Sequence, residues 1–196
     1  MKRLVLVLVL CVLVGFTVSA QTAQGPKMAV GWNPVAIIWD EFDVSFEYAF
    51  TTNMTAKGML SYSPNLAWLS GMTLFGFQAE FRYYFFGGAV GGFYAGAGGG
   101  FNVIGGSFDL LGVTVTYSGF LPDIFAEIGY KWVVGKTGGF YLEPFFGYEL
   151  AFGTVSVTVS GGTFTGVSPA VGGILYGLNL GWAFGGPSAS GGGGSR

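Results

Sequence analysis

The alternation of side chains over residues 75–85 constrains the fold of this chain more than any other feature. Its odd positions are apolar and mostly aromatic, namely Phe75, Phe77, Ala79, Phe81, Tyr83 and Phe85. Its even positions include Gln78, Glu80 and Arg82. Successive side chains of a strand point to opposite faces, so the pattern predicts a strand with one aromatic and one charged face. Large aromatic residues opposite both signs of charge are typical of a transmembrane barrel strand, with lipid outside and a polar lumen inside.

The composition favours a membrane setting as well. Only 9% of the residues are charged and 51% are hydrophobic, whereas soluble domains carry about 25% charged residues. Basic residues are scattered and acidic ones outnumber them between residues 21 and 184, so no basic stripe exists to bind nucleic acid.

The first twenty residues have the pattern of a cleaved secretory signal peptide. Lys2 and Arg3 precede an apolar run over 4–16, and small residues at 18–20 form a cleavage site. Thirteen apolar residues are too few for a membrane-spanning helix, which needs about 20. The only cysteine, Cys11, lies in this segment, and the chain has no histidine. We therefore expect no cofactor, no Cys or His metal site and no enzymatic activity, since membrane-barrel hydrolases generally use a histidine base.

Alternating segments divide the rest of the chain into candidate strands. They cover 28–39, 42–51, 55–63, 73–86, 93–104, 123–134, 140–152 and 174–184, the first interrupted by Asn33-Pro34. Short connections alternate along the chain with long ones at 64–72, 105–122 and 153–173, as in outer-membrane barrels. The pattern predicts an all-β fold, an eight-stranded antiparallel up-and-down transmembrane β-barrel over 21–184, followed by a flexible Gly/Ser tail over 185–196.

Two other folds compete with this prediction. Residues 83–108 carry no charge, and Gly92, Gly96 and Gly100 have the small-xxx-small spacing of packed membrane helices. So many glycines would each cost a helix about 1 kcal/mol, however, and alternate glycines suit the crowded interior of a narrow barrel. A soluble lipocalin-like barrel would need the aromatic face inside and the charged face outside.

Charged side chains on the inward parity form the first candidate site. The predicted lumen network consists of Glu47, Lys57, Glu80, Arg82, Glu127, Lys131, Glu143 and Glu149. The turn positions place Lys131 opposite Glu143 and bring Glu47 near Lys57. Two interpretations stay open: a gate or ion path, and a salt-bridge network that fills an interior with room for little more than side chains.

Residues 153–173 supply the second candidate site. The segment around Gly161-Gly162 reads as a hairpin above the membrane, with 111–117 as its neighbour. An apolar pocket at the outer mouth would be lined by Val113, Val115, Val155, Val157 and Phe164. Ordinary packing within the hairpins is the alternative interpretation.

Several segments resemble small eight-stranded bacterial outer-membrane barrels, the OmpX/OmpA/OmpW-like proteins and the outer membrane protein beta-barrel domain family. They are FEYAF at 46–50, AEFRYYF at 79–85, GGFYAGAGGGF at 91–101, EIGYKWVVG at 127–135, GGFYLEPFFGYE at 138–149 and GLNLGWAF at 177–184. The resemblance implies a location in the bacterial outer membrane, contact with its lipid, and a monomer. Trp182 and Phe184 would belong to the C-terminal signal that the outer-membrane assembly machinery reads.

The resemblance is specific for fold and location, and such barrels serve many roles. The first functional expectation is a non-enzymatic structural or surface-interaction protein that contacts a partner through its long extracellular loops. The alternative is an OmpW-like conduit that carries a small hydrophobic ligand across the outer membrane.

Overall fold

The computed structural model describes residues 25–186, apart from 66–70, 87, 89, 111, 136–137 and 160–161. The predicted signal peptide at 1–20 lies outside the described residues, as do residues 187–196 of the predicted tail.

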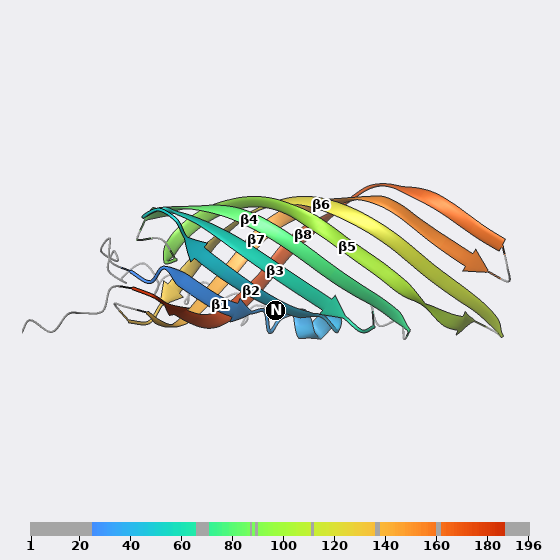
Figure 1. Ribbon diagram of the computed structural model, residues 1–196, viewed down its shortest axis with the longest axis horizontal. Coiled ribbons are helices and arrows are strands. Elements are labelled where there is room, and N and C mark those ends of the chain that lie inside the picture. The colour runs from blue at the N-terminus through green and yellow to red at the C-terminus, as the bar shows by residue number, and fades with distance from the viewer. Residues whose placement is uncertain are drawn as a thin grey trace, which may run out of the picture.

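Strands make up almost all of the described chain, and they close into a barrel (Figure 1). The strands are β1 (Met28–Trp32), β2 (Phe42–Ala49), β3 (Met54–Ser63), β4 (Met72–Phe86), β5 (Gly92–Leu110), β6 (Val113–Val133), β7 (Gly139–Val159) and β8 (Gly162–Phe184). Each strand pairs antiparallel with the next, and β8 pairs back to β1. The prediction of an all-β fold with antiparallel up-and-down strands is confirmed. In the described part of the chain no helix has the length and apolar character needed to cross a membrane.

The predicted sidedness of the strands is confirmed. On β4, Phe81 is 66% exposed while its neighbour Arg82 is 1% exposed. On β2, Tyr48 is exposed and Glu47 is buried. The aromatic parity therefore forms the outer wall of the ring, and the charged parity fills the lumen.

Residues 105–122 and 153–173 were expected to connect strands, with a hairpin in the second segment and 111–117 as its neighbour. The hairpin is confirmed, and the four strands β5, β6, β7 and β8 run further through both segments than predicted. Because β4 stops pairing with β5 at Met72↔Gly106, these four strands continue beyond the ring as an open sheet. Figure 1 shows this sheet at the end opposite the start of β1 and the end of β8. We call its described residues in 107–117 and 155–166 the extension.

The sidedness of the strands reverses in the extension. Its outer face carries hydroxyl pairs, with Ser156 and Thr165 3.2 Å apart and Thr158 and Thr163 3.0 Å apart. Its inner face carries the apolar side chains, and the rings of Phe108 and Tyr117 stack there with their centroids 5.5 Å apart. The wall that is apolar outside along the ring thus becomes polar outside beyond it.

A small apolar cluster closes the end of the barrel that holds the short turns. Val90, in the connection between β4 and β5, is fully buried and adopts a positive φ of 68°. It packs with Ala29, Ala49, Val133, Tyr141 and Ala183. Val90 therefore lies inside the lumen at this end, among inward side chains of five strands.

The first strand is much shorter than predicted. β1 ends at Trp32, and the Asn33 side chain then accepts a hydrogen bond from the Val35 amide at 3.1 Å, which forms a turn. A 3-10 turn, η1 (Ala36–Trp39), follows. Because β1 pairs with β8 only over Leu180–Phe184, β8 has a pairing partner on one side only from Gly162 to Asn179.

Candidate functional site

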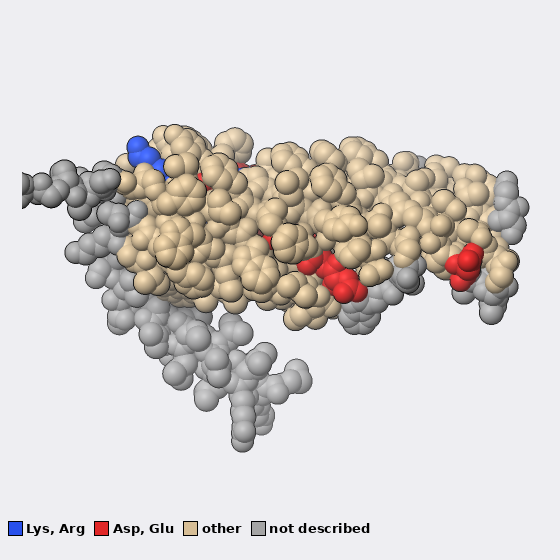
Figure 2. All heavy atoms as spheres, turned by 60° about the horizontal axis from the view of Figure 1, so that its bottom comes forward, with Lys and Arg blue, Asp and Glu red and all other residues tan. Residues whose placement is uncertain are grey.

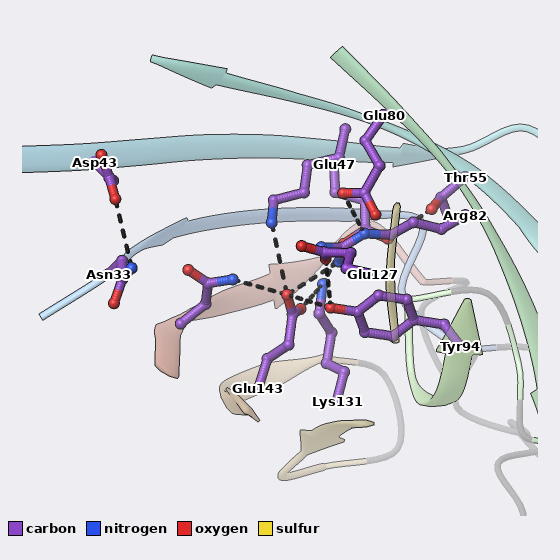
Figure 3. Close-up of polar contacts among 12 residues, drawn as sticks. Asn33, Asp43, Glu47, Thr55, Glu80, Arg82, Tyr94, Glu127, Lys131 and Glu143 are labelled. Carbon is purple, nitrogen blue, oxygen red and sulfur yellow. Dashed lines mark hydrogen bonds and ion pairs between the residues drawn. The ribbon is translucent and has the colours of Figure 1, made fainter. Parts of the chain in front are cut away.

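A buried ion network with Arg82 at its centre (Figure 3) fills the part of the lumen nearer the short turns. The guanidinium of Arg82 reaches four carboxylates on different strands. Its contacts are Glu80 at 2.8 Å, Glu127 at 2.7 Å, Glu143 at 3.0 Å and Glu47 at 3.4 Å. Its guanidinium carbon also lies 4.1 Å from the ring centre of Tyr94. The side chain of Arg82 is fully buried, so each of these charge-assisted contacts is formed away from solvent.

Two lysines complete the cationic side of the network. Lys131 on β6 pairs with Glu47 and lies 2.7 Å from Glu143. Lys57 on β3 lies 3.6 Å from Glu143. Glu143 therefore meets all three cations, and it also accepts a hydrogen bond of 2.8 Å from the Asn179 amide. Four carboxylates against three cations nearly balance the buried charge.

Hydroxyl donors satisfy much of the remaining acceptor capacity. Glu47 accepts hydrogen bonds from Thr55 at 2.6 Å and from Tyr84 at 2.7 Å. Tyr94 donates to Glu127 at 2.9 Å. The sequence analysis named none of these hydroxyl groups as site residues, although all three lie on the inward parity next to the charges. That parity was the signal that could have identified them.

Glycine on β5 makes room for the network. A side chain at Gly96 would collide with the Glu80 carboxylate and with the stem of Arg82. An eight-stranded interior has room for little more than side chains, so the bare backbone at Gly96 leaves the space that Glu80 and Arg82 occupy.

Seven of the eight predicted network residues come together, and the predicted registers agree. Glu47 pairs directly with Lys57, and Lys131 faces Glu143 across β6 and β7. Glu149 differs, because among the described residues it forms no ion pair and lies instead on the wall of a cavity nearer the extension.

That cavity has a volume of about 330 Å³. Its wall includes Lys57, Glu127 and Asn179, so it begins at the ion network. It continues past Gln78 and Asn102, the second of which donates to Asp123 at 3.0 Å. Its far side is formed by residues of η1, β2 and β8. This cavity was not predicted from the sequence, and the Asn33-Pro34 interruption of the first strand was the available signal.

The five residues of the predicted mouth pocket lie together on the inner face of the extension. Val157 pairs with Phe164, and Val115 on β6 is buried. Phe164 is 70% exposed, however, and none of the five lines the cavity described above. They form one apolar sheet face open to its surroundings.

The two residues of the predicted assembly signal lie at the end of β8. Trp182 is 59% exposed and faces outward. Phe184 pairs with Met28 at the start of β1, so it closes the ring. In the described part of the chain, no group of three or more His, Cys, Asp or Glu side chains is placed to hold a metal ion.

Comparison with known proteins places the chain in one family. No curated protein and no solved structure matches it. The profile of the family described as "Protein of unknown function (DUF3575)" matches residues 6–152, which is well over half of the 196 residues. That match runs through β7 as far as the point where the strand leaves the ring. The chain therefore belongs to the DUF3575 family.

Proposed function

We propose that this protein is an eight-stranded, non-enzymatic barrel of the bacterial outer membrane, closed to solutes, whose extension contacts a partner at the cell surface. One observation carries the proposal. Every Lys, Arg, Asp and Glu on the ring strands of the described chain points into the lumen, while the outer wall is apolar. Figure 2 shows one face of the molecule, and charged atoms are sparse over most of its length. Such a wall is suited to lipid.

The height of the apolar wall supports a bilayer setting. On β7 the outward parity is apolar from Phe140 to Phe152 and turns to hydroxyl residues from Thr154 onward. Twelve steps of about 3.3 Å along a strand tilted by about 35–45° give a height of roughly 28–32 Å. A typical hydrocarbon core is about 30 Å thick. The change from apolar to hydroxyl side chains thus falls where the outer headgroups would begin.

Two blocks along the lumen support a barrel closed to solutes. The ion network fills the part of the ring nearer the short turns, and the Val90 cluster lies next to it at the end that holds these turns. Moving a solute through the lumen would require breaking several buried ion pairs at once. Each charge left unpaired in the interior would cost free energy. This arrangement favours the structural interpretation of the lumen charges over the gate.

Fractionation and conductance measurements test this proposal. We expect the expressed protein in the outer-membrane fraction, with a compact form that migrates faster on gels until it is boiled. In planar bilayers it should give no stepwise conductance. Loss of cell or matrix binding when the tips of the extension are shortened would support the partner surface. Regular conductance steps from the unmodified protein would contradict the closed barrel.

A conduit for small hydrophobic molecules is the second candidate, and the cavity favours it. A liposome uptake assay with an apolar dye separates the two functions. If the inner face of the extension guides such molecules, Val155→Asp should lower the uptake rate severalfold, while Thr158→Asp on the outer face should not. Uptake equal to that of protein-free liposomes would remove the conduit.

A further inference from the structure

We infer that the cavity between the ion network and η1 binds a small organic ammonium ion with an apolar arm, which enters through the side of the barrel. This inference rests on the proposed membrane setting, because the arm would lie in lipid. It does not require transport across the membrane.

The barrel wall has an interruption at the cavity. Among the residues that the structure describes, β8 has no pairing partner on its β1 side from Asn179 to Gly162, because β1 stops at Trp32. The turn at Asn33 and η1 occupy the place where β1 would have continued. In Figure 1, η1 lies about halfway along the barrel, within the length of the ring strands. The ring is therefore not sealed by backbone hydrogen bonds at this height.

Outward-facing residues on both sides of this interruption line the cavity. Val44 on β2 and Tyr176 on β8 are exposed on the outer wall, yet both contribute to the lining, as does Trp39 of η1. The cavity therefore lies against the barrel wall at the place where β1 has ended. The rim is apolar, and Ile37 and Ile38 beside it are more than half exposed. A hydrocarbon arm placed in the rim would thus continue into an apolar exterior.

The inner part of the cavity has an excess of negative charge. Its lining includes the carboxylates Glu41, Asp43, Glu127 and Glu149 and a single cation, Lys57. Glu127 is neutralised by Arg82, and Lys57 is engaged by Glu143. Among the described residues, Glu41, Asp43 and Glu149 form no ion pair. An incoming cation would therefore meet carboxylates that lack a positive partner.

Asp43 supplies a specific acceptor for such a cation. One of its oxygens accepts a long hydrogen bond of 3.4 Å from Asn33, as Figure 3 shows. Its other oxygen, Oδ1, is buried and accepts no hydrogen bond from a nitrogen or hydroxyl donor in the described part of the chain, and the Glu41 carboxyl lies beside Asp43. A buried oxygen left without a donor is costly. An ammonium group would donate to it, and the amide and hydroxyl groups of Gln78 and Ser61 in the same lining would provide further polar contacts.

The volume limits the ligand to a small molecule. About 330 Å³ lies at the lower end of the range for ligand pockets, roughly 300–1,000 Å³. An ammonium group with a chain of several carbons fits this space with part of the chain in the rim. A neutral alcohol of the same length would fill the same volume but would leave the carboxylates unpaired.

Equilibrium dialysis against the protein in nanodiscs of zwitterionic lipid tests the inference, with protein-free nanodiscs subtracted. The probes are radiolabelled octylammonium and octanol. We expect saturable binding of one octylammonium per chain and at least tenfold weaker binding of octanol. The double variant Asp43→Asn/Glu149→Gln should weaken octylammonium binding at least tenfold, whereas Asp109→Asn, an acid of the extension, should leave it unchanged. Ser45→Phe should abolish binding of both probes by filling the cavity.

Failure of this inference can be told apart from failure of the proposed function. Each variant is first tested for nanodisc insertion and for heat-modifiable migration, which report on the membrane barrel alone. Absence of saturable octylammonium binding to an inserted, heat-modifiable protein would overturn the site. Equal binding of both probes, unaffected by the double variant, would overturn the assignment of an ammonium ligand.

Discussion

At the scale of single residues, Arg82 determines whether the lumen is stable. Its guanidinium is planar and has five donors, so it can serve carboxylates from several strands at once, which the ammonium group of a lysine cannot match. Arg82 forms ion pairs with four carboxylates, those of Glu47, Glu80, Glu127 and Glu143. Removing it would leave four buried carboxylates with two lysines.

We therefore expect Arg82→Met to lower the free energy of unfolding by about 3–5 kcal/mol, the range found when one partner of a buried ion pair is removed. The measurement is urea unfolding of the protein in lipid bilayers, followed by tryptophan fluorescence. Lys27→Met is the matched control, because Lys27 is an exposed cation at the end with the short turns, and its loss should change stability by less than about 0.5 kcal/mol. Equal effects of the two substitutions would show that the network does not stabilise the fold.

Gly96 gives a second prediction at this scale. A side chain at this position would meet Glu80 and Arg82, so Gly96→Val should destabilise the barrel even though valine suits a strand. Gly58→Val on β3 is the control, because nothing lies near the added carbon there. In the same unfolding experiment, Gly96→Val should have a much lower free energy of unfolding than Gly58→Val. The reverse order would contradict a lumen packed around glycine.

At the scale of elements, strands with regular alternation could be predicted from sequence and irregular ones could not. The alternation of side chains on β2 and β4 predicted which side chains point outward. The turn positions predicted which charges face one another, because a short turn leaves little freedom in the register of the two strands that it joins. Beyond the ring, the Gly161-Gly162 turn signal predicted the hairpin, but not its continuity with the ring strands. These segments are rich in Thr, Ser and Gly and reverse their sidedness, so an outward-apolar template does not extend into them. β1 was predicted too long, because its local sequence does not indicate the turn that forms at Asn33.

The extension should be dispensable for folding. Its pairs lie outside the ring and away from the ion network, so replacing 108–115 and 156–165 each by Asn-Gly should leave the heat-modifiable form and the urea midpoint unchanged. Val90→Asp offers the contrast, because it buries a charge in the cluster that closes the other end, and it should lower the folded fraction. A shortened protein that loses its compact form would mean that the extension helps to hold the ring together.

At the scale of the whole molecule, the two sidedness patterns together predict where a bilayer would sit. Ring strands are apolar outside, and the extension is polar outside, so the boundary between them should mark the outer headgroups.

Single tryptophan probes in a variant whose five native tryptophans are replaced by phenylalanine can locate this boundary. Phe146→Trp lies on the outer wall of β7, and Thr163→Trp lies on the outer face of the extension. Lipids brominated near the bilayer centre should quench the first probe strongly and the second hardly at all. Acrylamide in the water should give the opposite order. If brominated lipid quenches both probes equally, the reversal of sidedness does not mark a membrane surface. If it quenches neither probe, the apolar wall is covered by protein instead.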